Sequence, residues 1–220
     1  MPADSAADSP ESNLRSALQR HQIDLPSEQI SLLENYCQAL WDWNAKVNLT
    51  RHTDYDKFVA RDVADALVLS RHIQPEERIL DVGSGGGAPA VVLAILRPDL
   101  TVALSESVGK KARVLADIVQ NLGLALPVHH CRAEDVLAAQ SFDTLTARAV
   151  ASLAKLLVWF EPYWGAFDRL LAIKGPGWVE ERQEARQRGL MAKLQLRKLE
   201  NWPLPGTDSE SVLLEVRPKS

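Results

Sequence analysis

Two patterns of hydrophobic and polar residues divide the chain near Pro75. Before this proline, apolar residues recur every three or four positions, which predicts helices. A short helix is expected over residues 13–23, a second begins with Ser27 as its N-cap, and a third is capped by Thr53. We therefore expect residues 13–75 to form a helical unit that packs against the rest of the chain.

Beyond Pro75, short apolar strands alternate with helical stretches. The expected strands span residues 78–82, 101–105, 127–130, 142–147 and 169–174, with one or two more within 194–199 and 211–216. The expected helices span residues 89–96, 109–122, 152–160 and 177–190. This alternation predicts an α/β domain over residues 76–220, with a doubly wound, mostly parallel sheet that binds ligands above the carboxyl ends of its strands.

Composition narrows the class of protein. Hydrophobic residues make up 46% of the chain, as is usual for a globular domain with a sizeable core. Cys37 and Cys131 provide neither a disulfide framework nor a metal-binding spacing, so we expect a reducing cytoplasm and no metal. No apolar run approaches the roughly 18–20 residues that cross a bilayer, and the acidic N-terminus does not resemble a signal peptide. A membrane partner is therefore not expected.

The distribution of charge bears on nucleic-acid binding. The net charge is −4, but residues 1–12 hold three acids and no base, which leaves 26 acids and 25 bases in the remainder. We expect residues 1–12 to be a disordered acidic tail. An RNA site would then be a local basic patch, for which Lys110 and Lys111 are candidates.

The segment 79–88, Ile-Leu-Asp-Val-Gly-Ser-Gly-Gly-Gly-Ala, has the pattern of a ligand-binding turn. A strand containing Asp81 runs into glycines at positions 83, 85 and 87, which let the backbone approach a ligand and adopt positive φ angles. The helix that follows directs unpaired N–H groups and its positive dipole end at the turn. The segment predicts a nucleotide-type ligand.

Glycine spacing and two acids favour one nucleotide. The dinucleotide fingerprint is G-x-G-x-x-G, whereas this chain has G-x-G-x-G after an acid, which resembles motif I of class I S-adenosylmethionine-dependent methyltransferases. Glu106, at the end of the next strand, is placed to accept both ribose hydroxyls. Residues 133–135 follow the third strand, where such folds hold adenine. The alternatives are solvated loop acids at Glu106 and Asp135, and an NAD-linked oxidoreductase.

Five further segments are informative: Trp43-Asn44 with Lys46, Asn48-Leu49-Thr50, Ser107-Val-Gly-Lys-Lys, Arg148-Ala-Val-Ala-Ser-Leu and Ile173-Lys174-Gly175. Together with the glycine turn, they resemble one family within that superfamily, the bacterial 16S rRNA (guanine-N7) methyltransferases of the RsmG/GidB type. The resemblance runs from about residue 28 to the C-terminus.

The resemblance implies a Rossmann-like methyltransferase sheet with an N-terminal helical extension. The methyl donor would be S-adenosyl-L-methionine, and the acceptor would be N7 of one guanine in 16S rRNA, within the small subunit or its assembly intermediate. We expect a monomer. The implied cofactor contacts are Gly83, Gly85, Gly87, Ala88, Glu106, Ala133, Glu134 and Arg148.

Acceptor chemistry agrees with guanine N7. A cytosine carbon needs a cysteine nucleophile, and neither cysteine follows the fourth strand. An adenine amine usually brings Asn-Pro-Pro-Tyr, where this chain reads Ala-Arg-Ala-Val over residues 147–150. Guanine N7 carries a free lone pair, and an Arg or Lys can hold the O6 edge. Arg148 and Lys174 are therefore expected to position substrate, without a general base. A structural ion pair from Arg148 to Asp81 or Asp143 is the alternative.

The RNA side of the site depends on the helical unit. Asn48 and Arg61 are expected to face the same cleft, although a turn role is an alternative for Asn48. The family's usual histidine after Arg61 is Asp62 here, and an acid cannot take over a phosphate-facing imidazolium. Two competing functions therefore stay open: a same-fold methyltransferase acting on a small molecule or protein, and a non-catalytic ribosome-binding relative.

Among the tryptophans, Trp159 is expected to lie in the core.

Overall fold

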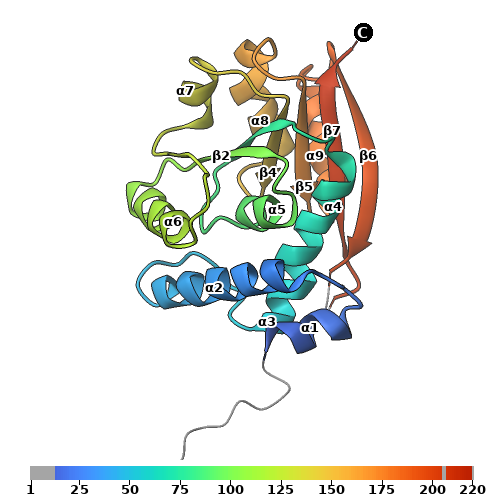
Figure 1. Ribbon diagram of the computed structural model, residues 1–220. Coiled ribbons are helices and arrows are strands. Elements are labelled where there is room, and N and C mark those ends of the chain that lie inside the picture. The colour runs from blue at the N-terminus through green and yellow to red at the C-terminus, as the bar shows by residue number, and fades with distance from the viewer. Residues whose placement is uncertain (1–12, 205–206, 220) are drawn as a thin grey trace, which may run out of the picture.

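A seven-stranded sheet with helices on both faces forms the centre of the molecule (Figure 1). The computed structural model describes residues 13–204 and 207–219, so the predicted acidic tail lies outside the described residues. The strand order is β3-β2-β1-β4-β5-β7-β6. The strands are β1 (Arg78–Val82), β2 (Thr101–Ser105), β3 (Val128–His129), β4 (Thr144–Arg148), β5 (Arg169–Lys174), β6 (Leu194–Pro203) and β7 (Glu210–Pro218).

The sheet has the predicted doubly wound, mostly parallel topology. Strands β1 to β5 pair in parallel, while β7 pairs antiparallel with both β5 and β6. The bounds of β1, β2 and β5 are the predicted ones. Because the order reverses between β1 and β4, the loops after these strands form a crevice at the carboxyl edge of the sheet.

Helices fill both faces of the sheet. They are α5 (Ala90–Leu96), α6 (Gly109–Asn121), α7 (Ala133–Leu137), α8 (Leu153–Phe160) and α9 (Trp178–Gln187), with a 3₁₀ turn over Glu161–Tyr163. Helix α7 was not predicted, because five residues are too few to show a helical period.

The N-terminal helices are α1 (Leu14–Arg20), α2 (Ser27–Asn44), α3 (Tyr55–Lys57) and α4 (Ala64–His72). Two predicted caps are wrong by one residue. Pro26, not Ser27, is the N-cap of α2, and Asp54, not Thr53, caps α3 by accepting a hydrogen bond from Lys57 N at 2.8 Å. An Asp carboxylate at this position also interacts favourably with the helix dipole, which a threonine does not offer.

A π-helical segment, Phe58–Val63, joins α3 to α4. Single π-turns inside helices are rare and often lie at functional sites. This one contains Arg61 and Asp62, and it is followed in the first turn of α4 by Asp65.

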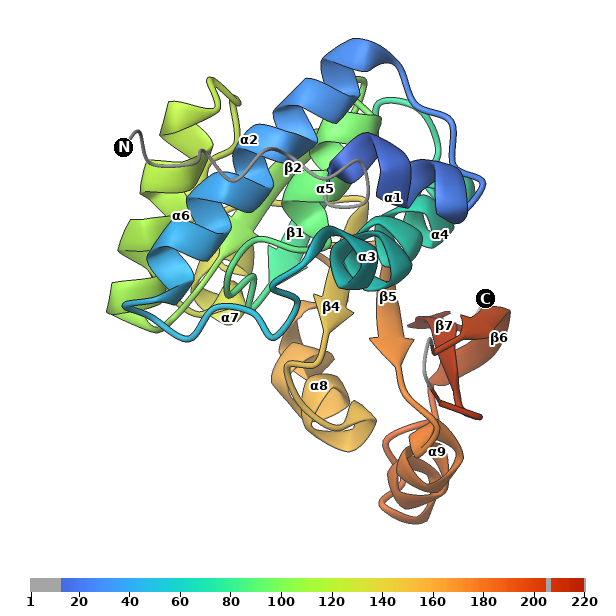
Figure 2. The same cartoon turned by 90° about the horizontal axis from the view of Figure 1, so that it is seen from below.

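Two apolar clusters occupy opposite faces of the sheet. Two neighbouring residues of β1 show this division. Ile79 belongs to one cluster and Leu80 to the other, because successive side chains of a strand point to opposite faces of the sheet. The Ile79 cluster joins α1, α2 and α4 to α5 and α6, while the Leu80 cluster includes α7, α8 and α9. Figure 2 shows α2 lying across α5 beside α6, so the N-terminal helices share the core of the sheet. No helix among the described residues is long and apolar enough to cross a membrane.

Candidate cofactor and acceptor pockets

The glycine loop between β1 and α5 has the backbone that its sequence predicts. Gly83, Gly85 and Gly87 have φ angles of +64°, +57° and +105°. A Cβ on Gly87 would lie 2.7 Å from Val91 Cγ2 and 2.9 Å from Leu115 Cδ1, so packing alone requires this glycine. Around Gly85 the nearest atom to an added Cβ would be 3.9 Å away, so this part of the loop is open.

Glu106 lies against this loop at the end of β2. Its side chain is 5% exposed, and its Oε2 accepts a hydrogen bond from Gly85 N at 2.9 Å. Oε1 accepts from Val108 N at 2.7 Å. These bonds and this burial exclude a solvated loop acid. Asp135 is exposed and accepts from Arg132 N at the start of α7, so its observed contact belongs to a helix N-terminus.

A pocket of about 80 Å³ opens beside the loop, at the carboxyl ends of β1 and β2. It brings together three predicted cofactor residues: Gly83, Ala133 and Glu134. Trp159, expected in the core, is half-buried and lines this pocket as well, with the Arg132 guanidinium 5.0 Å from the centre of its ring. The other lining residues are Val82, Ser105, Ser107, Cys131, Arg132 and Val150.

Asp81 lies beneath the loop and is 2% exposed. Burial raises the pKa of this carboxyl to about 6, although Thr146 Oγ1 donates to Asp81 Oδ1 at 2.6 Å and lowers the pKa in part. Among the described residues, no cluster of three or more His, Cys, Asp or Glu side chains could hold a metal ion.

A second pocket, of about 320 Å³, lies between the π-helical segment and the ends of β4 and β5. It brings together three residues that the sequence singled out for substrate: Arg61, Arg148 and Lys174. Val150 lines this pocket and also the cofactor-side pocket, so the two adjoin at one side chain. The remaining lining residues are Asp65, Ala149, Ala151, Ile173, Gly175, Glu181, Leu204 and Ser211.

Arg148 is held by two carboxylates and one carbonyl. Its Nη1 lies 2.7 Å from Asp62 Oδ1 and 2.8 Å from Asp65 Oδ2, and its Nη2 donates to Ala88 O at 3.1 Å. Arg148 therefore does form a structural ion pair, which was the alternative interpretation, but its partners are Asp62 and Asp65 and not Asp81 or Asp143. Asp62 is 1% exposed, so the acid that replaces the family's histidine faces inward and not toward a bound phosphate.

Lys174 and Arg61 differ in how firmly they are held. Lys174 is 8% exposed, donates to Ala151 O, and lies 2.8 Å from Glu181 Oε2. The buried Nε of Arg61 has no hydrogen-bond partner in the described part of the chain. Arg61 thus keeps one buried donor without a partner at this pocket, whereas the Lys174 ammonium is already bonded.

Asn48 and the lysine pair are not brought into either pocket. Asn48 is exposed in a turn after α2, which we call the Asn48 turn (residues 45–51). Asn44 organises this turn, because its Oδ1 accepts from Leu49 N and Thr50 N at 2.8 and 3.0 Å. Lys110 Nζ donates to Lys46 O at 2.9 Å and so joins α6 to the turn, while Lys111 is half-buried on α6.

Two supporting residues were not predicted. Tyr36 Oη donates to Gly86 O at 2.9 Å, a contact between α2 and the glycine loop that no local sequence pattern indicated. Val150 lies within the Arg148–Leu153 motif, and only the structure shows that it separates two pockets.

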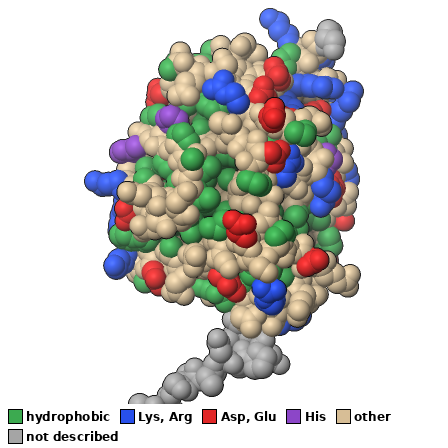
Figure 3. Space-filling view, viewed as in Figure 1, with side chains coloured by type: hydrophobic (Ala, Val, Ile, Leu, Met, Phe, Trp, Pro, Cys, Tyr) green, Lys and Arg blue, Asp and Glu red, His purple; other side chains and the backbone are tan. Residues whose placement is uncertain are grey.

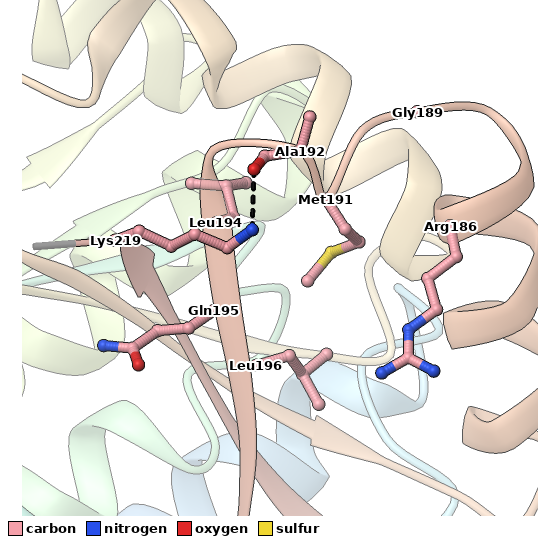
Figure 4. A pocket seen from close by; sticks show the side chains of 8 residues that line it. All are labelled: Arg186, Gly189, Met191, Ala192, Leu194, Gln195, Leu196 and Lys219. Carbon is pink, nitrogen blue, oxygen red and sulfur yellow. Dashed lines mark hydrogen bonds between the residues drawn. The ribbon is translucent and has the colours of Figure 1, made fainter.

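A larger cavity, of about 530 Å³, lies at the opposite end of β6 and holds none of the predicted site residues (Figure 4). In this cavity Lys219 Nζ donates to Ala192 O, and Arg186 approaches from α9. Figure 3 shows Lys and Arg side chains gathered near the C-terminal end of the chain, at the upper right. The predicted chemistry is therefore confined to the other end of the sheet.

Strand order, glycine loop and adjoining pockets together define a Rossmann-like methyltransferase fold. Solved structures agree at the level of the fold. The YcgJ protein from Bacillus subtilis aligns with a TM-score of 0.55 and 13% identity, over 72% of this chain and 99% of that one. An S-adenosylmethionine-dependent O-methyltransferase from Thermotoga maritima aligns with a TM-score of 0.53 and 14% identity, over 82% and 72%.

Sequence comparison identifies the family. The family model described as rRNA small subunit methyltransferase G matches residues 29–203. The ribosomal RNA small subunit methyltransferase G of Rhodopirellula baltica is 48% identical over 88% of this chain and 84% of its own length. That of Halorhodospira halophila is 38% identical over 80% and 83%. The chain belongs to the rRNA small subunit methyltransferase G family, which confirms the resemblance and excludes the NAD-linked alternative.

Proposed function

We propose that the protein transfers the methyl group of S-adenosylmethionine to N7 of a guanine in small-subunit rRNA. The observation that carries this proposal is the meeting of two pockets at Val150. One pocket holds three of the predicted cofactor residues, and the other holds cationic side chains suited to a guanine. Because the two pockets lie on either side of one side chain, a methyl donor in the first and a guanine in the second would be neighbours.

The residues around the first pocket have the chemistry that a nucleoside cofactor requires. Bound S-adenosylmethionine supplies an electrophilic methyl group on a sulfonium. Gly83 and Gly85 keep the loop free of side chains on the ligand side, and the Glu106 carboxylate stands where it can accept the ribose hydroxyls. Ala133 and Trp159 offer an apolar wall for the adenine ring.

The second pocket suits an acceptor that needs positioning and not deprotonation. Guanine N7 would react through its own lone pair, so no residue of the pocket needs to take a proton from it. Arg61 can hold the O6 edge of the base. Cys131 lines the other pocket and Cys37 is buried in α2, so attack on a cytosine carbon gains no support.

Delivery of one base into this pocket requires the nucleotide to leave its stack. The Asn48 turn and Lys110 lie outside the pockets, on a surface from which they can contact the flanking backbone. Such contacts position the RNA and do not read its sequence. The proposed partner is 16S rRNA within the small subunit or its assembly intermediate.

The test is transfer of label from S-adenosylmethionine to small subunits taken from a strain that lacks the modification. Borohydride–aniline cleavage then maps N7-methylguanine. A single new cleavage site in the small-subunit rRNA is expected, with naked rRNA assayed in parallel to identify the substrate form. Label without cleavage would move the acceptor to another atom. No label, with S-adenosylhomocysteine bound, would refute the proposed reaction.

A further inference from the structure

His52 follows the Asn48 turn and is fixed by its own backbone. Its N–H donates to Thr50 Oγ1 at 2.9 Å, and its carbonyl accepts from Trp41 Nε1 at 2.7 Å. The imidazole Nδ1 lies 2.7 Å from Asp62 Oδ2, with side-chain exposures of 22% and 1%. Because a carboxylate oxygen can only accept, Nδ1 carries the hydrogen in this contact.

Asp62 is an ionised carboxylate in the interior. Burial alone would raise its pKa, but the hydrogen bond from His52 and the charge of Arg148 outweigh burial and hold the pKa below its usual value. Its Oδ2 is hydrogen-bonded to His52, whereas its Oδ1 lies 2.7 Å from Arg148 Nη1 as an ion pair and has no hydrogen-bond partner among the described residues.

The Arg148 guanidinium is shared by two such carboxylates. On the far side, Asp65 accepts from Trp202 Nε1 at 3.1 Å through Oδ1, while its Oδ2 faces Arg148. Each carboxylate thus has an outer donor that fixes it, His52 for Asp62 and Trp202 for Asp65. Both carboxylates approach the same nitrogen, Nη1, and Nη2 donates to Ala88 O in the glycine loop, so these three contacts together orient the planar guanidinium.

The Asn48 turn is connected to the glycine loop by two routes. Directly, Leu49 packs on the loop, since a Cβ on Gly86 would lie 3.2 Å from Leu49 Cβ. Indirectly, His52 reaches Ala88 through Asp62 and Arg148. The same Arg148 lines the proposed acceptor pocket.

We propose that His52 is a positioning residue for methyl transfer, which sets Arg148 through Asp62 and so couples the Asn48 turn to both pockets. This inference rests on the proposed function. His52 touches neither cofactor nor substrate in it; its role is to hold the carboxylate that holds the guanidinium. Asp62, which stands where the family usually has a histidine, is thus the residue that connects His52 to Arg148.

The first test replaces the imidazole. His52→Ala is expected to lower kcat/KM for small subunits by about 10–100-fold, the loss typical of one hydrogen bond to a charged group. His52→Asn places an amide N–H near the position of Nδ1, and we expect it to restore activity to within about threefold of wild type. His21→Ala, an exposed histidine 3.9 Å from Asp56, is the matched control and should be fully active. All assays are run well below each variant's Tm.

The second test asks whether His52 acts through Asp62. In a double-mutant cycle on kcat/KM, Asp62→Asn combined with His52→Ala should be no slower than Asp62→Asn alone. Additive losses, or a His52→Ala variant as active as wild type, would overturn the inference. An inactive wild-type protein would instead refute the proposed function, so the two failures are distinct. Loss of activity in both His52→Ala and His52→Asn, with unchanged Tm, would also count against the inference.

Discussion

The hydroxyl of Tyr36 donates a hydrogen bond of 2.9 Å to the carbonyl oxygen of Gly86, which fastens α2 to the centre of the glycine loop. Both residues are buried, and the Tyr36 ring packs against Phe58 with ring centres 6.1 Å apart. The N-terminal helices therefore support the cofactor loop as well as the core. In this respect the helical extension is part of the site.

Replacing Tyr36 by Phe should destabilise both the fold and the loop. The buried carbonyl of Gly86 would lose its donor, which costs about 1–3 kcal/mol in the free energy of unfolding. Urea denaturation measures this loss, and titration calorimetry should show weaker binding of S-adenosylhomocysteine. Tyr163→Phe, in the 3₁₀ turn, is the control. An unchanged affinity in Tyr36→Phe would show that the bond does not shape the loop.

Gly85 and Gly87 in the glycine loop should respond differently to replacement by alanine. Gly85 has a φ of +57° and open surroundings, so Gly85→Ala should weaken S-adenosylhomocysteine binding while costing only about 1–2 kcal/mol of stability. Gly123, with a φ of +65° and no neighbour within 4 Å, is a control with the same backbone strain away from the loop. Gly87→Ala would collide with Val91 and Leu115, and its Tm should fall furthest. Equal cofactor affinity in Gly85→Ala and Gly123→Ala would contradict a ligand-facing Gly85.

The raised pKa of Asp81 predicts that the folded protein loses stability as the pH rises. Its pKa is raised to about 6 in the folded protein, so the group's favourable contribution is complete below pH 4 and is lost as the pH rises through about 6. Asp81→Asn removes the charge and keeps the acceptor for Thr146. At pH 8 the variant should be more stable than wild type by roughly 1–3 kcal/mol, and the difference should shrink toward pH 4. Exposed Asp168→Asn should show no such trend in parallel denaturation experiments.

Arg148→Ala should lose stability as well as turnover. From the sequence we would expect turnover to suffer more than folding, but Asp62 and Asp65 would be left buried without their shared cation. Breaking a buried pair in this way costs about 3–5 kcal/mol. Chemical denaturation of Arg148→Ala beside the charge-preserving Arg148→Lys separates the two effects. A fully stable Arg148→Ala would mean that the two carboxylates gain protons or other partners.

Arg61→Ala should behave in the opposite way. The Arg61 Nε has no hydrogen-bond partner among the described residues, so its removal should change Tm by little. If Arg61 contacts the acceptor nucleotide, kcat/KM for small subunits should fall by about 10-fold or more, the range of 1–3 kcal/mol for one base contact. Arg15→Ala, an exposed arginine on α1, is the control. Equal activity of the two variants would remove Arg61 from the site.

Local patterns explain which elements the sequence could predict. Strands β1, β2 and β5 are short apolar runs closed by polar or turn residues, and their bounds need no knowledge of the fold. The cap at Asp54 differs from the predicted Thr53 because neighbouring polar residues compete for one helix terminus. The π-helical segment Phe58–Val63 could not be predicted, because a single turn with one extra residue leaves no periodic signal in the sequence.

The candidate site also has parts that local sequence patterns predict and parts that only the folded structure determines. The glycine loop and Glu106 lie within one strand–helix–strand unit, so spacing alone located them. Asp65, one partner of Arg148, lies 83 positions earlier in the chain, and it is fixed in turn by Trp202 from another element. No local pattern encodes such pairings, which is why the sequence suggested an ion pair with Asp81 or Asp143 instead.

The acceptor pocket is assembled from segments made at different times. Residues between Val82 and Trp159 line the whole of the pocket beside the glycine loop. The second pocket also needs Leu204 and Ser211, and Trp202 fixes Asp65. A chain interrupted before β7 would carry the cofactor loop with an unfinished place for the base. During synthesis, the complete lining of this pocket would therefore form only once β7 has been made.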